Sequence, residues 1–330
     1  MAILSTGVGI DVSDHHVRLA WTNHSGVPKG LYELVLPPGF IVDDRVEKPE
    51  GLKKRLLDLV GRSELGKTEA QTVLLVPESR VFSTSIEIAG KGTQDVDRAQ
   101  ALKLGQAEIP IPFREAIVFV RSAYQKKKAD HGRMSVLAVE QRLIQEYRSA
   151  FELPALPLTA IESGGSGWMR LFDRFGVQEL HKERDTDLLM IVDIGHRWTN
   201  LTVYDKISVV VFSRSILLKD ATGGSGKEQT LSATHLDQVC QMMEESLAYF
   251  KGIGLRIPFI LLAGAESADA SLGAACADRL KEVRIMRVGE AVQIPEVTPE
   301  DVHVYGAAIG AALRGARTSF YKKDHNFLVI

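Results

Sequence analysis

The sequence predicts an α/β fold made of two similar lobes. A strand, a tight turn carrying an aspartate and a second strand occur twice, around Asp11 and again around Asp193, at an offset of 182 positions (193 minus 11). A third strand-like run follows each copy, so each is expected to form a three-stranded meander. Between the copies, a helical pattern over residues 52–60 precedes a short apolar run at 72–76. This strand, helix, strand order is typical of α/β folds.

The composition is that of a soluble globular protein and excludes several functional classes. The 330 residues suffice for two domains, with 45% hydrophobic and 25% charged residues. A net charge of −2 gives no electrostatic reason to expect nucleic-acid binding. Cys240 and Cys276 lie far apart, which suits a reducing compartment and argues against a zinc cluster. There is no signal-peptide pattern and no apolar run of about 18–20 residues, so we expect a cytoplasmic protein without a transmembrane segment.

The character of the sequence changes between residues 90 and 151. A polar helix is predicted at 95–106, then a proline-rich stretch (EIPIPF) at 108–113, two strands at 116–123 and 133–140, and a helix at 141–151. We interpret this segment as an inserted α+β subdomain. The lysine run at 126–128 is read as a solvated hairpin tip, with a docking patch as the alternative. The predicted division is a first lobe at 1–89 and 152–185, the insert at 90–151, a second lobe at 186–316 and a C-terminal tail at 317–330.

The turns after the two repeated strands have the chemistry of a phosphate site. Backbone N–H groups approach a phosphate closely where small residues leave room, as Ser13 and Gly195 do. A carboxylate at such a turn holds water around a phosphate-bound Mg²⁺, which is the role predicted for Asp11 and Asp193. The alternative interpretation is two ordinary hairpins with aspartates in their turns.

The order of these segments resembles the actin-like ATPase superfamily and, within it, the PilM family of type IV pilus assembly. The stretches that carry the resemblance are collinear and cover most of the chain: residues 8–20, 73–88 (VLLVPESRVFSTSIEI), 108–113, 136–162, 193–204, 263–267 and 305–315. The resemblance implies an α/β fold of the actin-like (ribonuclease H-like) type, with two lobes and an FtsA/PilM-type inserted subdomain in the first lobe.

The resemblance also implies where a nucleotide would bind. By position, the first phosphate loop is Asp11, Ser13 and Asp14, the second is Asp193, Gly195, Thr199 and Asn200, and the adenosine loop is Gly264, Ala265 and Glu266. The implied cofactors are ATP and Mg²⁺, with Asp11 and Asp193 as metal ligands through water. The first loop departs from the family pattern at Ser13 and Asp14. The Cβ of Ser13 and the negative charge of Asp14 both oppose the binding of a γ-phosphate. We therefore expect ATP binding with little or no hydrolysis.

Glu162 is the single catalytic candidate. It lies where the superfamily often places the residue that orients the attacking water. A carboxylate at the start of a helix has an equally good structural reason, because acidic groups are favoured at helix N-termini. His15 and His16 are adjacent on a predicted strand and point to opposite faces, which argues against a shared metal.

The resemblance implies a cytoplasmic scaffold of pilus or secretion assembly, peripheral to the inner membrane, that recruits the cytoplasmic tail of a PilN-type membrane protein. Pilus motor ATPases are further candidate partners. The alternatives are a nucleotide-free pseudo-ATPase similar to the cytoplasmic domain of GspL, a small-molecule kinase of the same fold, and a filament-forming protein like FtsA. The kinase lacks a visible catalytic aspartate, and the FtsA reading lacks an amphipathic terminal helix. The tail, residues 317–330, is expected either to pack on its own fold or to tether the protein.

Overall fold

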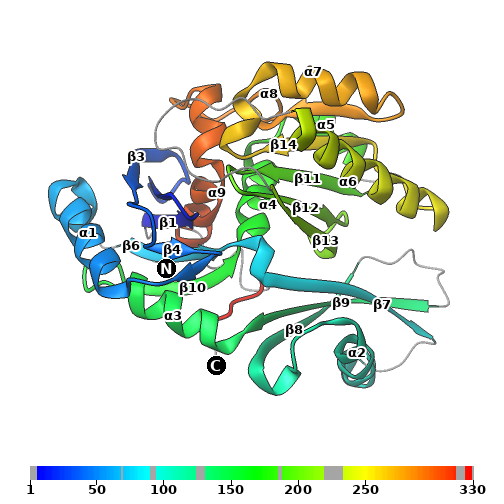
Figure 1. Cartoon of the computed structure of the whole chain (residues 1–330), viewed down its shortest axis with the longest axis horizontal. Coiled ribbons are helices and arrows are strands. Elements are labelled where there is room, and N and C mark those ends of the chain that lie inside the picture. Colours follow the sequence, from blue (N-terminus) through cyan, green and yellow to red (C-terminus); the bar gives the residue numbers. More distant parts are fainter. Residues whose placement is uncertain are drawn as a thin grey trace.

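In the part of the chain that the structure describes there are two five-stranded sheets, one three-stranded sheet and one two-stranded hairpin (Figure 1). The computed structural model describes residues 6–67, 70–89, 94–123, 131–184, 188–218, 233–316 and 324–328. The lysine run at 126–128, predicted to be a hairpin tip, lies outside these residues. None of the described helices combines the length and the apolar character that a membrane crossing requires.

The first sheet has the strand order β10-β6-β1-β2-β3. Its strands are β1 (Thr6–Val12), β2 (His16–Thr22), β3 (Pro28–Val35), β6 (Ala70–Val76) and β10 (Leu158–Ser163). The first three form the predicted antiparallel meander, and β6 and β10 add to it in parallel. Because β6 is covered on both faces, its residues form a nearly continuous apolar run. The hairpin β4 (Ile41–Val42) and β5 (Arg45–Val46) and the helices α1 (Pro49–Arg62) and α3 (Gln141–Phe151) complete this lobe.

The second sheet repeats the arrangement of the first, in the order β13-β12-β11-β14-β15. Its strands are β11 (Leu189–Ile194), β12 (Trp198–Tyr204), β13 (Val210–Leu217), β14 (Phe259–Ala263) and β15 (Arg284–Arg287). The predicted second meander is confirmed, and again two parallel strands follow the first strand of the meander. The helices of this lobe are α5 (Gln178–Arg184), α6 (Ala233–Gly252), α7 (Ala270–Arg279) and α8 (Val288–Ala291).

The small sheet begins earlier in the chain than the boundary predicted at residue 90. It consists of β7 (Val81–Ala89), β9 (His131–Glu140) and β8 (Ala116–Ser122), with α2 (Gln94–Glu108) packed on it. Strand β7 pairs with β9 along its whole length and contributes Ile86 and Ile88 to a separate apolar core. Helix α3, which was placed in the insert, instead buries Leu143 and Tyr147 in the core of the first lobe. The composition shift near residue 90 therefore marks the loop before α2 and not the start of the sheet.

Two helices lie between the large sheets: α4 (Gly164–Phe175) and α9 (Pro299–Ala316) (Figure 1). Helix α9 is rich in Gly and Ala because neighbouring backbone runs directly against it. A Cβ added to Gly310 would lie 1.8 Å from the carbonyl oxygen of Gly167 in α4. A Cβ added to Gly9 in β1 would lie 1.9 Å from the carbonyl oxygen of Ala308. The last described helix of the second lobe thus packs against the first strand of the chain.

We predict that Gly310→Ala destabilises the protein by about 1–3 kcal/mol or more, because the added methyl meets backbone that cannot turn aside. The matched control is Gly61→Ala in α1, where a Cβ would meet nothing within 4 Å. That change should leave the free energy of unfolding unaltered or raise it by up to about 1 kcal/mol. Urea unfolding of both variants measures the difference. Equal free energies of unfolding for Gly310→Ala and Gly61→Ala would contradict the close packing of α9.

Candidate functional site

The two repeated aspartates lie within range of each other's charge where the lobes meet. Asp11 is near the end of β1 and Asp193 near the end of β11. Burial raises the pKa of Asp193 to about 7, and the charge of Asp11 adds to the rise. Burial also raises the pKa of Asp11, opposed by the charge of Arg18. Among the described residues neither carboxylate has an ion-pair partner, and the charge of Arg18 only partly offsets the rise of the two pKa values.

The third predicted loop touches the second. Gly264 has a left-handed backbone (φ 86°), and a Cβ there would lie 2.3 Å from Oδ1 of Asp193. Ala265 and Glu266 follow in the short 3₁₀ turn η4 (Ala265–Ala268). Nδ1 of His196 lies 3.8 Å from Oε1 of Glu266, and this contact raises the pKa of His196. The structure thus brings the second and third loops together.

Helix α9 holds the third loop through a buried hydrogen-bond chain. The Ser267 hydroxyl donates to the carbonyl of Gly264 at 2.6 Å, and it lies 2.7 Å from Nδ1 of His303 on α9. Burial lowers the pKa of His303 to about 4, so its ring is neutral near pH 7. No role was predicted for Ser267 or His303.

Ser13 uses its polar groups within its own turn. Its N–H donates to the carbonyl of His16 at 2.9 Å, and the N–H of His16 donates to the Ser13 hydroxyl oxygen at 3.2 Å. A phosphate at this loop would have to compete with these bonds. The first loop is therefore a closed hairpin turn.

A direct ion pair joins the first loop to the second. Nη1 of Arg197 lies 2.9 Å from Oδ2 of Asp14, and Nη2 of the same guanidinium contacts Oδ1 of Asp43. Asp14 is buried, whereas Arg197 is about a third exposed. The rings of His15 and His196 also meet edge to face, with centroids 5.3 Å apart. No role was predicted for Arg197. The available signal was a long cation in a turn where a phosphate loop has small residues.

The tip of the β4–β5 hairpin presents Asp43 to Arg197. Asp43 and Asp44 both have left-handed backbones, with φ of 50° and 59°. Two consecutive residues with positive φ define the type I′ turn that matches the twist of a hairpin, and aspartate tolerates this conformation. The N–H of Asp44 donates to Oδ1 of Asp14 at 3.1 Å, and the Tyr147 hydroxyl donates to the carbonyl of Asp44 at 3.1 Å. Burial raises the pKa of Asp44 to about 6.

The remaining residues of the second loop differ in how they are engaged. The N–H of Gly195 donates to the carbonyl of Trp198 at 3.0 Å. Oδ1 of Asn200 accepts from the Ser215 hydroxyl at 2.7 Å. Thr199 is fully buried, and its hydroxyl finds no hydrogen-bond partner among the described residues. Thr199 is therefore the member of this loop with an unused polar atom.

Glu162 is enclosed between two arginines. It is fully buried at the end of β10 and pairs with Arg170 of α4 and with Arg314 of α9. Nη1 of Arg170 also donates to the carbonyl of Gly310 at 2.8 Å. The two guanidinium groups bind the carboxylate from two different helices, which is the arrangement of a structural link. The geometry favours the structural interpretation of Glu162, in which it joins a strand to the two central helices.

The residues at the loops fit a divalent cation better than they fit a triphosphate. Mg²⁺ prefers oxygen ligands and commonly keeps its water, and the Asp11–Asp193 pair offers two carboxylates that have no ion-pair partner among the described residues. The phosphate position is different. Ser13 is engaged within its turn, Asp14 adds a negative charge, and Arg197 already binds two carboxylates.

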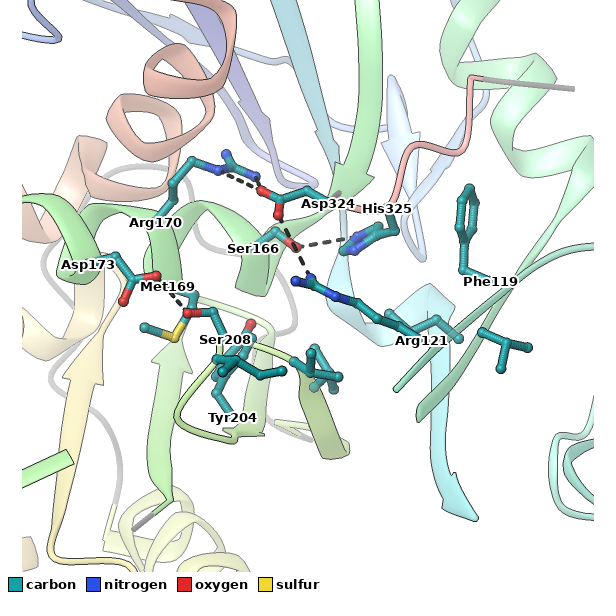
Figure 2. Close-up of a pocket in the computed structure, with 15 residues that line it drawn as sticks. Phe119, Arg121, Ser166, Met169, Arg170, Asp173, Tyr204, Ser208, Asp324 and His325 are labelled. Carbon is teal, nitrogen blue, oxygen red and sulfur yellow. Dashed lines mark hydrogen bonds and ion pairs between the residues drawn. The ribbon is translucent and has the colours of Figure 1, made fainter. Parts of the chain in front are cut away.

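A cavity of about 220 Å³ lies at a second junction, where the small sheet, α4 and the second lobe meet (Figure 2). Phe119 and Arg121 of β8 face it from one side, and Tyr204 and Ser208 of the second lobe from another. Residues 324–328 also reach this junction, so the described part of the tail packs on its own fold. No site was predicted here, because the residues come from segments far apart in the chain.

Comparison with known proteins identifies the fold. A chain from a PilM–PilN type IV pilus biogenesis complex superposes with a TM-score of 0.75 over 96% of this chain and 99% of that chain, at 18% identity. The chain has the actin-like fold. The predicted resemblance to the PilM family is thereby confirmed for the fold. No protein-family model matches the sequence, and no curated protein matches it.

Two further structures are similar at lower scores. EutJ, an ethanolamine utilization protein from Carboxydothermus hydrogenoformans, has a TM-score of 0.49 and 12% identity, over 93% of this chain and 89% of that chain. A protein of unknown function with an actin-like ATPase fold from Bacteroides thetaiotaomicron has a TM-score of 0.48 and 10% identity, over 88% of this chain and 93% of that chain. We draw nothing further from either.

We predict that Asp193→Asn stabilises the protein more at high pH than at low pH. A carboxyl whose folded pKa is raised destabilises the fold once the unfolded chain is ionised, so the destabilisation grows from about pH 4 to about pH 7. The gain should be about 1–4 kcal/mol at pH 8 and near zero at pH 4, measured by urea unfolding without Mg²⁺. The contrasting variant is Asp14→Asn, which removes a partner of Arg197 and should lower stability at pH 8. A gain for Asp193→Asn that does not change with pH would contradict this account.

Proposed function

We propose that this protein is a scaffold of type IV pilus assembly, or of a related secretion machine, that binds the cytoplasmic tail of a PilN-type membrane protein. The observation that carries the proposal is the superposition, over nearly the whole of both chains, on a chain from a PilM–PilN complex. At 18% identity that superposition supports the fold, and the partner class is our inference from it.

The cavity in Figure 2 has the chemistry that a short peptide needs. Apolar side chains such as Phe119, Met169 and Val210 line it, together with the charged side chains of Arg121 and Asp173. An apolar lining with a few polar groups is typical of binding pockets, because burial supplies affinity and polar contacts set orientation. The cavity lies between the small sheet, α4 and the second lobe, so a partner bound there would contact all three and its affinity would depend on how they are arranged.

The proposed localisation is cytoplasmic. The bound partner would hold the protein at the inner face of the membrane. Pilus motor ATPases are a further proposed class of partner. In this proposal the tail of the membrane protein supplies the attachment.

A second candidate is the nucleotide-independent form of the same scaffold, which the Arg197 ion pair favours. In a nucleotide-dependent protein of this fold, ATP between the two phosphate loops would hold the lobes. Here Arg197 connects these loops through Asp14 and Asp43. Nucleotide binding by the residues predicted from the sequence is the alternative. A small-molecule kinase is disfavoured, because the paired state of Glu162 gives no support to a water-orienting role.

The partner proposal predicts that the full chain binds a synthetic peptide with the N-terminal cytoplasmic sequence of a PilN-type protein and does not bind a scrambled peptide. Ile207→Asp, at an exposed cavity residue, should weaken binding at least about tenfold, because it places a charge in the apolar lining. The control is Ile253→Asp, which is equally exposed (46% against 45%) and does not line the cavity. Fluorescence anisotropy measures the affinities. Failure of every such peptide would refute the partner class.

The nucleotide-independent form predicts no heat of binding when the protein is titrated with ATP·Mg²⁺ and no release of phosphate. It also predicts that Arg197→Gln lowers the free energy of unfolding by about 1–3 kcal/mol, because buried Asp14 loses its partner. Arg214→Gln, which breaks an exposed pair with Glu245 within the second lobe, should change it by less than about 1 kcal/mol. ATP binding without phosphate release would instead support the nucleotide-binding scaffold, and release stimulated by a sugar would support a kinase.

A further inference from the structure

Residues 324–328 lie along the outer edge of the first sheet in the manner of a bound peptide (Figure 1). Strand β10 is an edge strand of that sheet, so one side of its backbone is open to pairing. The N–H of Phe327 donates to the carbonyl of Ile161 at 2.8 Å. The side chain of Asn326 completes the pairing: its Oδ1 accepts from the N–H of Ile161 at 3.0 Å, and its Nδ2 donates to the carbonyl of Thr159 at 3.3 Å.

Phe327 anchors this segment. Its side chain is fully buried, although the segment lies on an edge of the fold. The ring packs against Phe119 of β8, with centroids 5.6 Å apart, and against His325 at 5.0 Å. The ring therefore fills a space between the small sheet and the first lobe. A single buried aromatic residue beside main-chain hydrogen bonds is how strand-adding peptides combine affinity with specificity.

Polar contacts hold the segment on both sides of Phe327. Oδ2 of Asp324 lies 3.3 Å from Nη2 of Arg170, and Oδ1 lies 3.8 Å from Nη1 of Arg121 (Figure 2). The carbonyl of His325 accepts from Nη1 of Arg314 at 2.7 Å. Nε2 of His325 accepts from the N–H of Ser163 at 3.2 Å, which requires the unprotonated ring nitrogen. These partners belong to β8, β10, α4 and α9, and we call the surface they form with Ile161 and Phe119 the tail site.

The tail site is continuous with the cavity to which the proposed function assigns the partner. Asp324 and His325 line that cavity, so a molecule extending from it along β10 would meet the 324–328 segment directly (Figure 2). Residues 317–323 join the segment to α9, so it is always present close to the site. A tethered ligand of this kind acts at an effective concentration that is roughly millimolar.

We propose that the 324–328 segment occupies the tail site as a built-in competitor, and that the partner's tail binds by displacing it. The displacing peptide adds to the edge of β10 in an extended conformation. It places a large apolar side chain in the space of Phe327, and it offers an amide side chain next to that residue to bond the backbone of Thr159 and Ile161. The proposal rests on the proposed function, since it takes the partner to be the tail of a membrane protein.

Hydrogen exchange on the full chain, with and without a PilN-type peptide, tests the displacement. With peptide, amides at 324–328 should exchange at least about tenfold faster, while those at 159–163 stay protected because the peptide replaces the lost bonds. If the peptide binds and the exchange of 324–328 is unchanged, the inference is wrong and the proposed function stands. If the peptide binds Phe327→Ala and not the wild type, the competitor role is supported. If it binds neither protein, both proposals fail.

A second measurement needs no partner. A labelled peptide with the sequence of residues 323–330 should bind Phe327→Ala at least about tenfold more tightly than it binds the wild type, because the variant's own segment no longer competes well. Asn326→Ala should give a smaller change in the same direction. Tyr249→Ala, at an exposed aromatic residue of α6, is the control and should bind like the wild type. Equal affinities for the wild type and Phe327→Ala would overturn the competitor role.

Discussion

The arrangement of the whole chain depends on how closely α9 approaches its neighbours. Gly9 in β1, Gly167 in α4 and Gly310 in α9 let backbone touch backbone, where any Cβ would collide. Because α4 and α9 lie between the two large sheets, this contact sets how the lobes stand relative to each other. It thereby brings the ends of β1 and β11, and the carboxylates of Asp11 and Asp193, within range of each other's charge.

Charge at the junction of the lobes is distributed unevenly. Asp11 and Asp193 have no ion-pair partner among the described residues, and desolvation raises both pKa values although the charge of Arg18 opposes the rise. A short distance along the chain, Asp14 and Asp43 share one guanidinium, that of Arg197. The hairpin tip that presents Asp43 has two left-handed residues, a conformation that non-glycine residues adopt at some cost. Such local conflicts with ordinary folding preferences are typical of functional regions.

Much of the fold follows from the period of apolar residues, and the repeated meander around Asp11 and Asp193 gave its two-lobed plan. The partner of β7 did not follow, because an alternating strand shows which face is buried and not which strand it joins. The contact of Arg197 with Asp43 joins residues 154 positions apart, and no local pattern encodes it. The burial of Phe327 could not be predicted for the same reason, because its contacts are long-range and its own segment has the pattern of a polar tail. The nucleotide roles of the predicted loop residues stay predictions.

The 324–328 segment also covers a weak point of the first sheet. An uncovered β10 would present a row of unsatisfied backbone groups, to which a strand from another molecule adds readily. With Phe327 seated beside Ile161, that edge is closed. When the segment is displaced and nothing replaces it, the exposed edge of β10 favours self-association of the protein. The same few residues therefore also protect its solubility.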